Sequence, residues 1–306
     1  MGNSWKAAAA ALCLALLVRP SLAVDIEHRR VDVMSEGMRL AAYAYHPANP
    51  AGPLPLIVLS HGWGGTAAGL DFQARAFAEA GYYALALDYR GWGQSDARLV
   101  LDDLRPEARP RELREAVDPI DQATDLFNAI HWAMGEPLVD RDRVGLWGTS
   151  FSGGLVAYVA ARDPRVKAFV SQVGYFGESP RGGDAAARQR AYADATRRAR
   201  GELPFPEPGA HEIGNLRGAP LREKFLLYAP IDDVAGARGC AMLFIAAGRE
   251  ELFDNRRHPQ LAFERAPEPK QYVVIPGISH YGIYGEAREQ ATRLAIDWFN
   301  RHLKKT

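Results

Sequence analysis

A predicted strand that runs into a tight turn and then a helix constrains this chain more than any other feature. The apolar run at 143–147 leads into Gly-Thr-Ser-Phe-Ser-Gly at 148–153, and a helical pattern covers 152–162. A serine between small residues on such a bend projects its hydroxyl from the sheet, beside a backbone N–H that points into the same space. This geometry suits attack on an acyl carbonyl, so we expect Ser150 to be a nucleophile. Ser152 stands where a second glycine is more usual, and it is small enough for the tight turn.

Apolar runs alternate with helical patterns along most of the chain. Residues 26–47 predict an antiparallel hairpin at the sheet edge, with a turn at Ser-Glu-Gly. Further strands are expected at 56–60, 82–89, 143–147, 166–173, 241–246 and 271–275. Helices are expected at 67–80, 118–134, 152–162 and 286–303. This alternation predicts a doubly wound, mostly parallel α/β sheet, with the chemistry at the carboxyl ends of its strands.

One segment interrupts the alternation. Residues 176–238 are rich in Pro, Gly and Arg, and the segment is too long for a plain loop. We expect it to form a cap inserted after the sixth strand, with a helix near 184–201. The chain then divides into a signal peptide at 1–23 and one α/β domain at 24–306 that carries this cap.

The N-terminus has the pattern of a targeting segment. Lys6 precedes an apolar stretch at 7–18, and Ser-Leu-Ala at 21–23 forms a cleavage site. We expect export with cleavage after Ala23, which makes the protein secreted or periplasmic. Cys240 is then the only cysteine, so neither an intrachain disulfide nor a cysteine-based metal site is expected.

Composition narrows the choice of partners. The chain has 37 basic and 37 acidic residues and a formal net charge of zero, so no overall field favours nucleic acid or an anionic membrane. We expect a small-molecule or polymer-ester substrate, no nucleic acid, and no membrane insertion once the signal has been removed. The chemistry inferred below calls for no cofactor and no metal.

A serine nucleophile needs a base, and the base needs an orienting acid. His280 lies in the loop between the last predicted strand and the final helix, and we expect it to be the base. Three carboxylates follow the strand at 241–246, namely Glu250, Glu251 and Asp254. Counting three residues past the small residue that ends this strand selects Glu250, whereas counting from the next glycine selects Glu251. Asp254 on the same loop is a third candidate for the orienting acid.

The tetrahedral intermediate of acyl transfer needs N–H donors for its oxyanion. His-Gly-Trp-Gly-Gly at 61–65 follows the first buried strand, and its glycines let backbone amides approach a ligand closely. We expect the backbone N–H groups of Trp63 and Phe151 to be these donors. His61 is expected to pack the loop and to have no chemical role.

Taken together, these motifs resemble those of the α/β-hydrolase superfamily, and the likeness covers roughly 24–304. The elbow at Ser150, the His-Gly-X-Gly-Gly loop at 61–65, Asp-X-Arg-Gly-X-Gly-X-Ser at 88–95 and Gly-X-X-His at 277–280 occur in the superfamily's order. The likeness is greatest to the dienelactone-hydrolase-like and acyl-esterase branches, which include polyketide acyltransferases. A glutamate in place of the more frequent aspartate departs from the superfamily's pattern.

The resemblance implies an α/β-hydrolase fold and a Ser-acid-His triad, here Ser150, Glu250 and His280. It implies hydrolysis of a carboxylic ester or related acyl bond through an acyl-enzyme. Acyl transfer or peptide cleavage by the same triad is an alternative, and a non-catalytic binding protein of the same fold is another.

Overall fold

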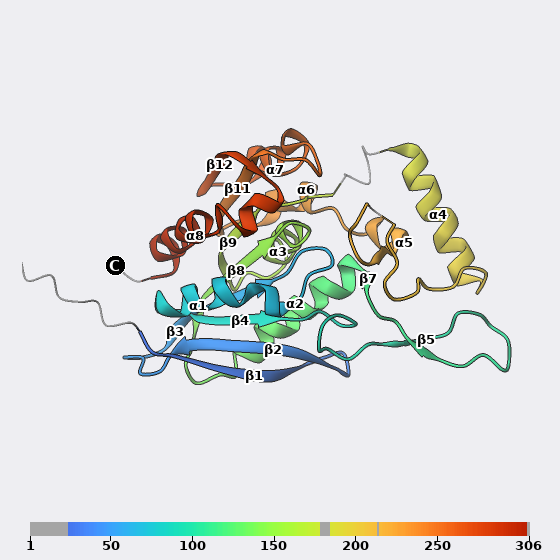
Figure 1. Cartoon of the computed structure of the whole chain (residues 1–306), viewed down its shortest axis with the longest axis horizontal. Helices are drawn as coiled ribbons and strands as arrows, with labels where there is room; N and C mark the ends of the chain where they lie inside the picture. The colour runs from blue at the N-terminus through green and yellow to red at the C-terminus, as the bar shows by residue number, and fades with distance from the viewer. Residues whose placement is uncertain (1–23, 178–183, 213, 305–306) are drawn as a thin grey trace, which may run out of the picture.

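The computed structural model describes residues 24–177, 184–212 and 214–304. The predicted signal peptide at 1–23 therefore lies outside the described residues. The centre of the fold is an eight-stranded sheet in the order β1-β2-β4-β3-β8-β9-β11-β12 (Figure 1). In that order the strands are β1 (Ile26–Ser35), β2 (Met38–Pro47), β4 (Tyr83–Leu87), β3 (Leu54–Ser60), β8 (Val139–Thr149), β9 (Val166–Gln172), β11 (Ala241–Arg249) and β12 (Lys270–Ser279).

Most neighbouring strands in this sheet are parallel. The edge hairpin of β1 and β2 is antiparallel and turns at Glu36 and Gly37, both of which have positive φ. β2 also runs antiparallel to β4, whereas the other pairs, from β4–β3 to β11–β12, are parallel. The predicted hairpin and the mostly parallel sheet are confirmed. The carboxyl ends of β3, β8, β11 and β12 therefore share one edge, where the predicted site residues follow them.

Helices cover both faces of the sheet. One face carries α2 (Pro119–Ala133), α3 (Ser152–Ala160) and α7 (Pro259–Arg265), and the other carries α1 (Asp71–Glu79) and α8 (Arg288–Leu303). Successive side chains of a strand point to opposite faces. In β3, Leu56 and Val58 accordingly join one core while Ile57 and Leu59 join the other. This explains why β3 reads as an unbroken apolar run. The seven-residue α7 was not predicted, because its pattern is too short to stand out.

Residues 176–238, called the cap segment below, leave the sheet between β9 and β11. Their described part contains α4 (Ala185–Ala199), β10 (Ala219–Pro220), α5 (Arg222–Phe225), α6 (Pro230–Asp233) and a 3₁₀ turn at Val234–Gly236. The helix expected near 184–201 is thus present as α4. α4 begins at the N-cap Asp184, whose side chain accepts a hydrogen bond from the backbone N–H of Ala186.

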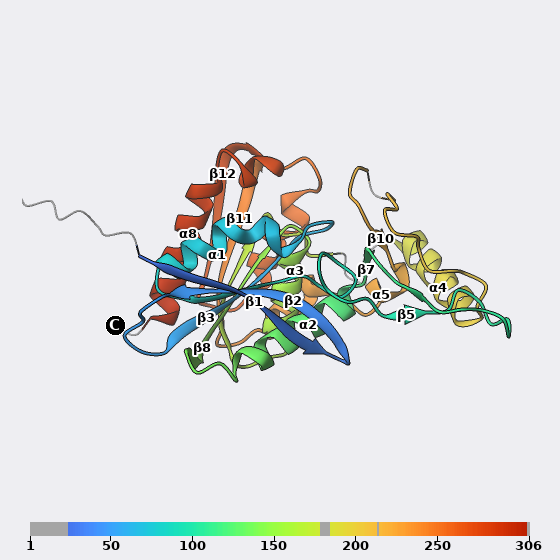
Figure 2. The same ribbon diagram turned by 60° about the horizontal axis from the view of Figure 1, so that its bottom comes forward.

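A second segment outside the central sheet, residues 97–117, packs against the cap segment and is called the cap arm. It contains β5 (Leu99–Val100), β6 (Arg111–Glu112) and β7 (Ala116–Val117). β5 pairs with β6, and β7 pairs in parallel with β10 of the cap segment. The cap arm and the part of the cap segment that contains α4, β10 and α5 form a lobe that projects from one end of the sheet, whereas α6 packs on α3 and α7 (Figures 1 and 2). The arm was not predicted, because strands of two residues leave no periodic pattern.

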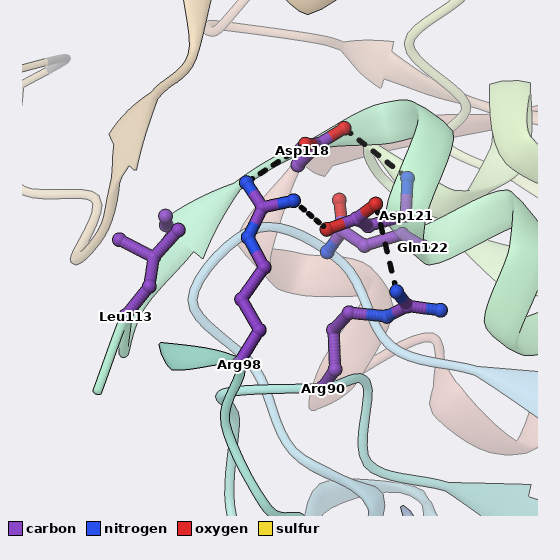
Figure 3. A pocket seen from close by; sticks show the side chains of 7 residues that line it. Arg90, Arg98, Leu113, Asp118, Asp121 and Gln122 are labelled. Carbon is purple, nitrogen blue, oxygen red and sulfur yellow. Dashed lines mark hydrogen bonds and ion pairs between the residues drawn. The ribbon is translucent and has the colours of Figure 1, made fainter. Parts of the chain in front are cut away.

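A cluster of charges joins this lobe to α2 (Figure 3). Arg98 of the arm lies 2.9 Å from Asp121 and 3.6 Å from Asp118, and Lys224 of the cap segment lies 3.8 Å from Asp118. Asp118 also caps α2, because its carboxylate accepts hydrogen bonds from the backbone N–H groups of Ile120 and Asp121. The cavity beside Arg98, Asp118 and Asp121 measures about 10 Å³, at the lower limit of the space that a single water molecule needs. The cluster is therefore a junction and has no room for a substrate.

Candidate active site

Ser150 occupies a strained bend between β8 and α3. Its φ is +56°, in the left-handed region that non-glycine residues rarely adopt. Hydrogen bonds hold the bend on both sides: the Ser150 N–H donates to the carbonyl of Gln172 at 2.8 Å, and the Ser150 carbonyl accepts from Tyr175 at 3.0 Å. Position 148, two residues before Ser150, requires glycine, since a Cβ there would lie 2.3 Å from the Ser152 carbonyl oxygen. The local fold is the sharp turn that the sequence predicts.

Three side chains from separate loops meet beside this turn. Oγ of Ser150 lies 3.0 Å from Nε2 of His280, and Nδ1 of His280 lies 2.9 Å from each carboxylate oxygen of Glu250. The side chains of His280 and Glu250 are each only 2% exposed. An ionised carboxylate can only accept, so Nδ1 carries the proton and donates it to Glu250. Nε2 is then left as the acceptor for the Ser150 hydroxyl.

The three carboxylates left open by the sequence have three different positions. Only Glu250 places its side chain against the imidazole. Glu251 is exposed, and its Oε2 accepts the backbone N–H of His280 at 2.6 Å. Asp254 caps a 3₁₀ turn (Asn255–Arg257) and forms an ion pair with Arg256 at 2.9 Å. Glu251 thus holds the backbone of the loop that carries His280, whereas the contacts of Asp254 are with Arg256.

The glycine loop at 61–65 lies against the elbow. A Cβ on Gly62 would fall 2.8 Å from Cβ of Ser150, so only glycine fits there. Among the described residues, the backbone N–H groups of Trp63 and Phe151 have no hydrogen-bond acceptor. His61 is buried and packs on Tyr89, with 4.5 Å between ring centroids. Burial lowers the pKa of His61, which keeps the ring neutral in this packing role.

The cap segment reaches the site through aromatic side chains. Nε1 of Trp63 donates to the carbonyl of Gly218 at 3.0 Å, which joins the glycine loop to the cap segment. The ring of Phe151 lies 5.5 Å from that of Trp63 and 5.9 Å from those of Phe225 and Tyr228. These four rings pack together into one apolar cluster that includes Phe151, the residue after Ser150. No sequence motif pointed to Gly218, Phe225 or Tyr228.

Ser152 has a partner for its hydroxyl beneath the site. This buried hydroxyl is hydrogen-bonded to the hydroxyl of Ser60 and, at 3.0 Å, to that of Tyr89. Tyr89 also contacts the carbonyl oxygen of His61 at 3.4 Å. The serine in the unusual position therefore links the elbow to the strand that carries the glycine loop. Sequence analysis treated Ser152 only as a small residue.

A second hydrogen-bonded group lies on the other side of Ser150. The Tyr284 hydroxyl is 2.9 Å from Oγ1 of Thr149, and Nε2 of Gln172 donates to the same oxygen at 3.2 Å. Burial raises the pKa of Tyr284 to about 12, so the hydroxyl keeps its proton. The motifs in the sequence assigned no role to Gln172, Tyr284 or the Thr149 side chain.

The described ranges contain neither a candidate metal site nor a candidate membrane-spanning helix. There, no three His, Cys, Asp or Glu side chains are grouped so that they could hold a metal ion. The helices of those ranges also include none with the length and apolar character needed to cross a membrane.

The strand order and the turn at Ser150 define an α/β hydrolase. Comparison with known proteins supports this class. Residues 36–192 match the family model described as X-Pro dipeptidyl-peptidase (S15 family), and the chain belongs to that family. An uncharacterized 31.7 kDa protein from Escherichia coli is 28% identical over 277 residues, which cover 81% of this chain and 91% of that protein.

A relative by sequence and two solved structures of similar fold carry names that refer to acyl chemistry or to the α/β-hydrolase fold. The polyketide transferase GrgF of a Penicillium species is 29% identical over 197 residues, covering 63% of this chain and 59% of that protein. Its crystal structure, described as an α/β hydrolase, has a TM-score of 0.70 at 23% identity and covers 90% of this chain and 99% of its own. A dienelactone hydrolase from Anabaena variabilis has a TM-score of 0.58 at 20% identity, over 91% and 99% of the two chains. The predicted dienelactone-hydrolase-like fold is confirmed.

Proposed function

We propose that this α/β hydrolase is a serine hydrolase that cleaves a carboxylic ester or related acyl bond. One observation carries the proposal: Ser150, His280 and Glu250 form an unbroken hydrogen-bonded series with spacings of 3.0 and 2.9 Å. A hydroxyl becomes a competent nucleophile when a positioned base takes its proton. Membership of a peptidase family and likeness to hydrolases and an acyl transferase are consistent with acyl chemistry.

In the first half of the reaction, Oγ of Ser150 bonds to the acyl carbon as its proton passes to Nε2 of His280. The resulting imidazolium is stabilised by the buried Glu250 carboxylate. The carbonyl oxygen becomes an oxyanion and accepts hydrogen bonds from the backbone N–H groups of Trp63 and Phe151, whose lack of other acceptors supports this role. His280 then protonates the departing alcohol as the original ester bond breaks, which leaves an acyl-enzyme.

In the second half, water attacks the acyl carbon while His280 takes its proton. The new tetrahedral intermediate collapses, the bond from the acyl carbon to Oγ breaks, and Ser150 regains its proton from the imidazolium. The free acid leaves. Within the aromatic cluster next to Ser150, the rings of Trp63 and Phe225 are only partly buried, which supports a substrate with an apolar group near the scissile bond.

Transfer of the acyl group to an alcohol or amine is the second candidate, since GrgF carries the name polyketide transferase. Peptide cleavage is a third, since the family model is named for a dipeptidyl-peptidase. An aqueous assay with graded alcohol or amine acceptors measures how the acyl-enzyme partitions. Parallel assays with nitrophenyl esters and X-Pro anilides separate esterase from peptidase activity.

The central test is labelling by a fluorophosphonate probe together with turnover of short-chain nitrophenyl esters. We expect the wild type to label and to turn over, and Ser150→Ala to do neither while it keeps the wild-type circular dichroism spectrum. Ser171→Ala is the matched control, because this buried serine on β9 has no hydrogen-bond partner for its hydroxyl among the described residues. It should label like the wild type. A folded wild type that neither labels nor turns over ester would exclude the proposed reaction.

We also propose that the protein is exported and cleaved after Ala23. The sequence pattern at 1–23 is its only support. N-terminal sequencing of protein recovered outside the cytoplasm should begin at Val24, and a mature protein that begins at Met1 would contradict the proposal.

A further inference from the structure

We infer that His61 is a positioning residue for the oxyanion, and that its ring N–H fixes the peptide unit whose other end is the N–H of Trp63. The inference rests on the proposed function, in which that N–H is an oxyanion donor. It gives His61 a second role besides its packing on Tyr89. Three observations carry it: the turn that contains Trp63, the contact of the imidazole with this turn, and the planarity of the peptide bond.

Residues 62–65 form a β-turn within the glycine loop. The Gly65 N–H donates to the Gly62 carbonyl at 3.1 Å, and Gly64, the third residue of the turn, has a φ of +72°. A positive φ at this position is typical of a type II turn and favours glycine. Trp63 is the second residue, whose N–H takes no part in the hydrogen bond that closes the turn. The turn therefore leaves this N–H without an acceptor among the described residues.

The imidazole of His61 reaches the same carbonyl. Its Nδ1 lies 2.9 Å from the Gly62 oxygen, and because a carbonyl oxygen can only accept, Nδ1 carries the proton and donates it. His61 is only 2% exposed, and its ring packs on those of Tyr89 and Trp92, with centroids 4.5 and 6.2 Å away. A Cβ on Gly65 would lie 3.1 Å from Cβ and 3.3 Å from Nδ1 of His61, which favours glycine there. The ring is thus held against the turn.

The peptide bond transmits this contact to Trp63. The bond between Gly62 and Trp63 is trans and planar, so the carbonyl and the N–H lie in one plane and point in opposite directions. Two donors, from His61 and Gly65, hold the carbonyl, and this fixes the direction of the N–H as well. The same hydrogen bonds polarise the peptide, which makes its N–H a stronger donor. A donor fixed in advance needs no reorganisation when the oxyanion forms.

Loss of the ring N–H should slow the reaction and leave substrate binding unchanged. His61→Leu removes the donor, whereas His61→Asn keeps one, because Nδ2 of asparagine is bonded to Cγ as Nδ1 of histidine is. We expect kcat for a nitrophenyl ester to fall about tenfold in His61→Leu, the worth of one net hydrogen bond. Loss of a whole oxyanion donor costs more, about 10²- to 10³-fold, but here Gly65 still holds the carbonyl. KM should change less than about twofold, and kcat of His61→Asn should lie within about threefold of the wild type.

Inhibition by a trifluoromethyl ketone tests the oxyanion itself. Oγ of Ser150 bonds to the ketone carbon, its proton passes to His280, and the ketone oxygen becomes an oxyanion in the place of the one formed in the reaction. An interaction made only with the transition state affects such an analogue as it affects the rate. The Ki should therefore rise about tenfold in His61→Leu and return to within about threefold of the wild-type value in His61→Asn.

His46→Leu is the matched control. His46 is also buried, its Nδ1 lies 2.9 Å from the carbonyl oxygen of the next residue, Pro47, and its ring stacks on that of Tyr83 at 5.4 Å. It lies on β2, which β4 and β3 separate from the strand that leads to Ser150. The substitution removes the same kind of contact and should leave kcat and Ki unchanged. His61→Phe is a second variant without the donor. It keeps an aromatic ring beside Tyr89 and replaces His61→Leu if that variant does not fold.

The possible outcomes separate this inference from the proposed function. A wild type that turns over ester, together with His61→Leu or His61→Phe protein that is equally active, would overturn the inference alone. Equal losses in His61→Leu and His61→Asn would do the same, because the N–H would then make no difference. So would a lower kcat with an unchanged Ki for the ketone, or a change in KM alone. A wild type that neither labels with a fluorophosphonate nor turns over ester would overturn the proposed function as well. Melting temperatures measured alongside show which variants are folded and can be compared.

Discussion

Both carboxylate oxygens of Glu250 lie 2.9 Å from Nδ1 of His280, while the next residue, Glu251, binds the backbone of the same histidine. Two adjacent acids thus hold one histidine: Glu250 contacts its ring and Glu251 its backbone N–H. Successive residues of an extended segment point to opposite sides, so neighbours in sequence reach different parts of one target. The arrangement yields different predictions for the two side chains.

Glu250→Gln should lower kcat by about 10⁴-fold, because the neutral amide no longer fixes the proton on Nδ1 or stabilises the imidazolium. Steady-state kinetics with a nitrophenyl ester provide the measurement. Asp254→Asn is the control on the same loop and should leave kcat near the wild-type value, since Asp254 contacts Arg256 and not the histidine. Equal losses in the two variants would contradict the assignment of Glu250 as the acid.

Glu251 should make stability depend on pH. Burial raises its pKa, but interactions with backbone N–H groups, foremost the hydrogen bond from the N–H of His280, outweigh this and hold the pKa below the usual 4.5. A carboxyl with a lowered pKa in the folded state stabilises the fold above its ordinary pKa, and this contribution disappears as pH falls through the folded value. The effect is small because the carboxylate is exposed.

The wild type should therefore be more stable than Glu251→Gln at pH 7, and the difference should shrink at about pH 3. Urea unfolding of both proteins at the two pH values measures it. A difference that grows as pH falls would show that Glu251 has the opposite effect from the one its contacts indicate.

Gly62→Ala should lower kcat by about 10²- to 10³-fold, comparable to the loss of one oxyanion donor. The added methyl would lie 2.8 Å from Cβ of Ser150 and 3.0 Å from the Thr149 carbonyl oxygen, so the loop that carries Trp63 must move. Gly69→Ala is the control, because a Cβ at that position meets nothing within 4 Å. Wild-type kcat in Gly62→Ala would argue against a donor on this loop.

Ser152→Ala should lower the free energy of unfolding by about 1 kcal/mol, because Ser60 and Tyr89 lose their shared buried partner. Urea denaturation should show a lower midpoint with an unchanged slope. Ser171→Ala removes a buried hydroxyl that has no partner among the described residues and should be neutral. If both variants were as stable as the wild type, the hydrogen bonds of the Ser152 hydroxyl would contribute nothing to the free energy of unfolding.

The strands that form the sheet could be predicted because each is buried on one or both faces. β3 and β8 pass through the middle of the sheet, so burial favours apolar residues along 56–59 and 144–147. The turn at Ser150 could be predicted for a related reason. Steric contact at Gly148, where a Cβ would lie 2.3 Å from a carbonyl oxygen, restricts the residue type that can stand there.

The cap arm and the hydrogen-bonding partners could not be predicted in this way. β7 pairs with β10 across roughly one hundred residues of chain through two residues each, and no local pattern encodes such a contact. Tyr284, Gln172 and Tyr89 are ordinary residue types at ordinary positions. Their importance arises only because the fold brings them to Thr149, Ser150 and Ser152.

The sequence by itself determined a parallel α/β sheet, a serine on a strained bend, and a histidine and several acids at the ends of later strands. Local sterics and burial restrict residue types at those positions, so the pattern can be read one segment at a time. Only the tertiary structure decided that Glu250, and neither Glu251 nor Asp254, meets the ring of His280. That choice depends on the direction of each side chain relative to a loop about thirty residues away, which chain position alone does not determine.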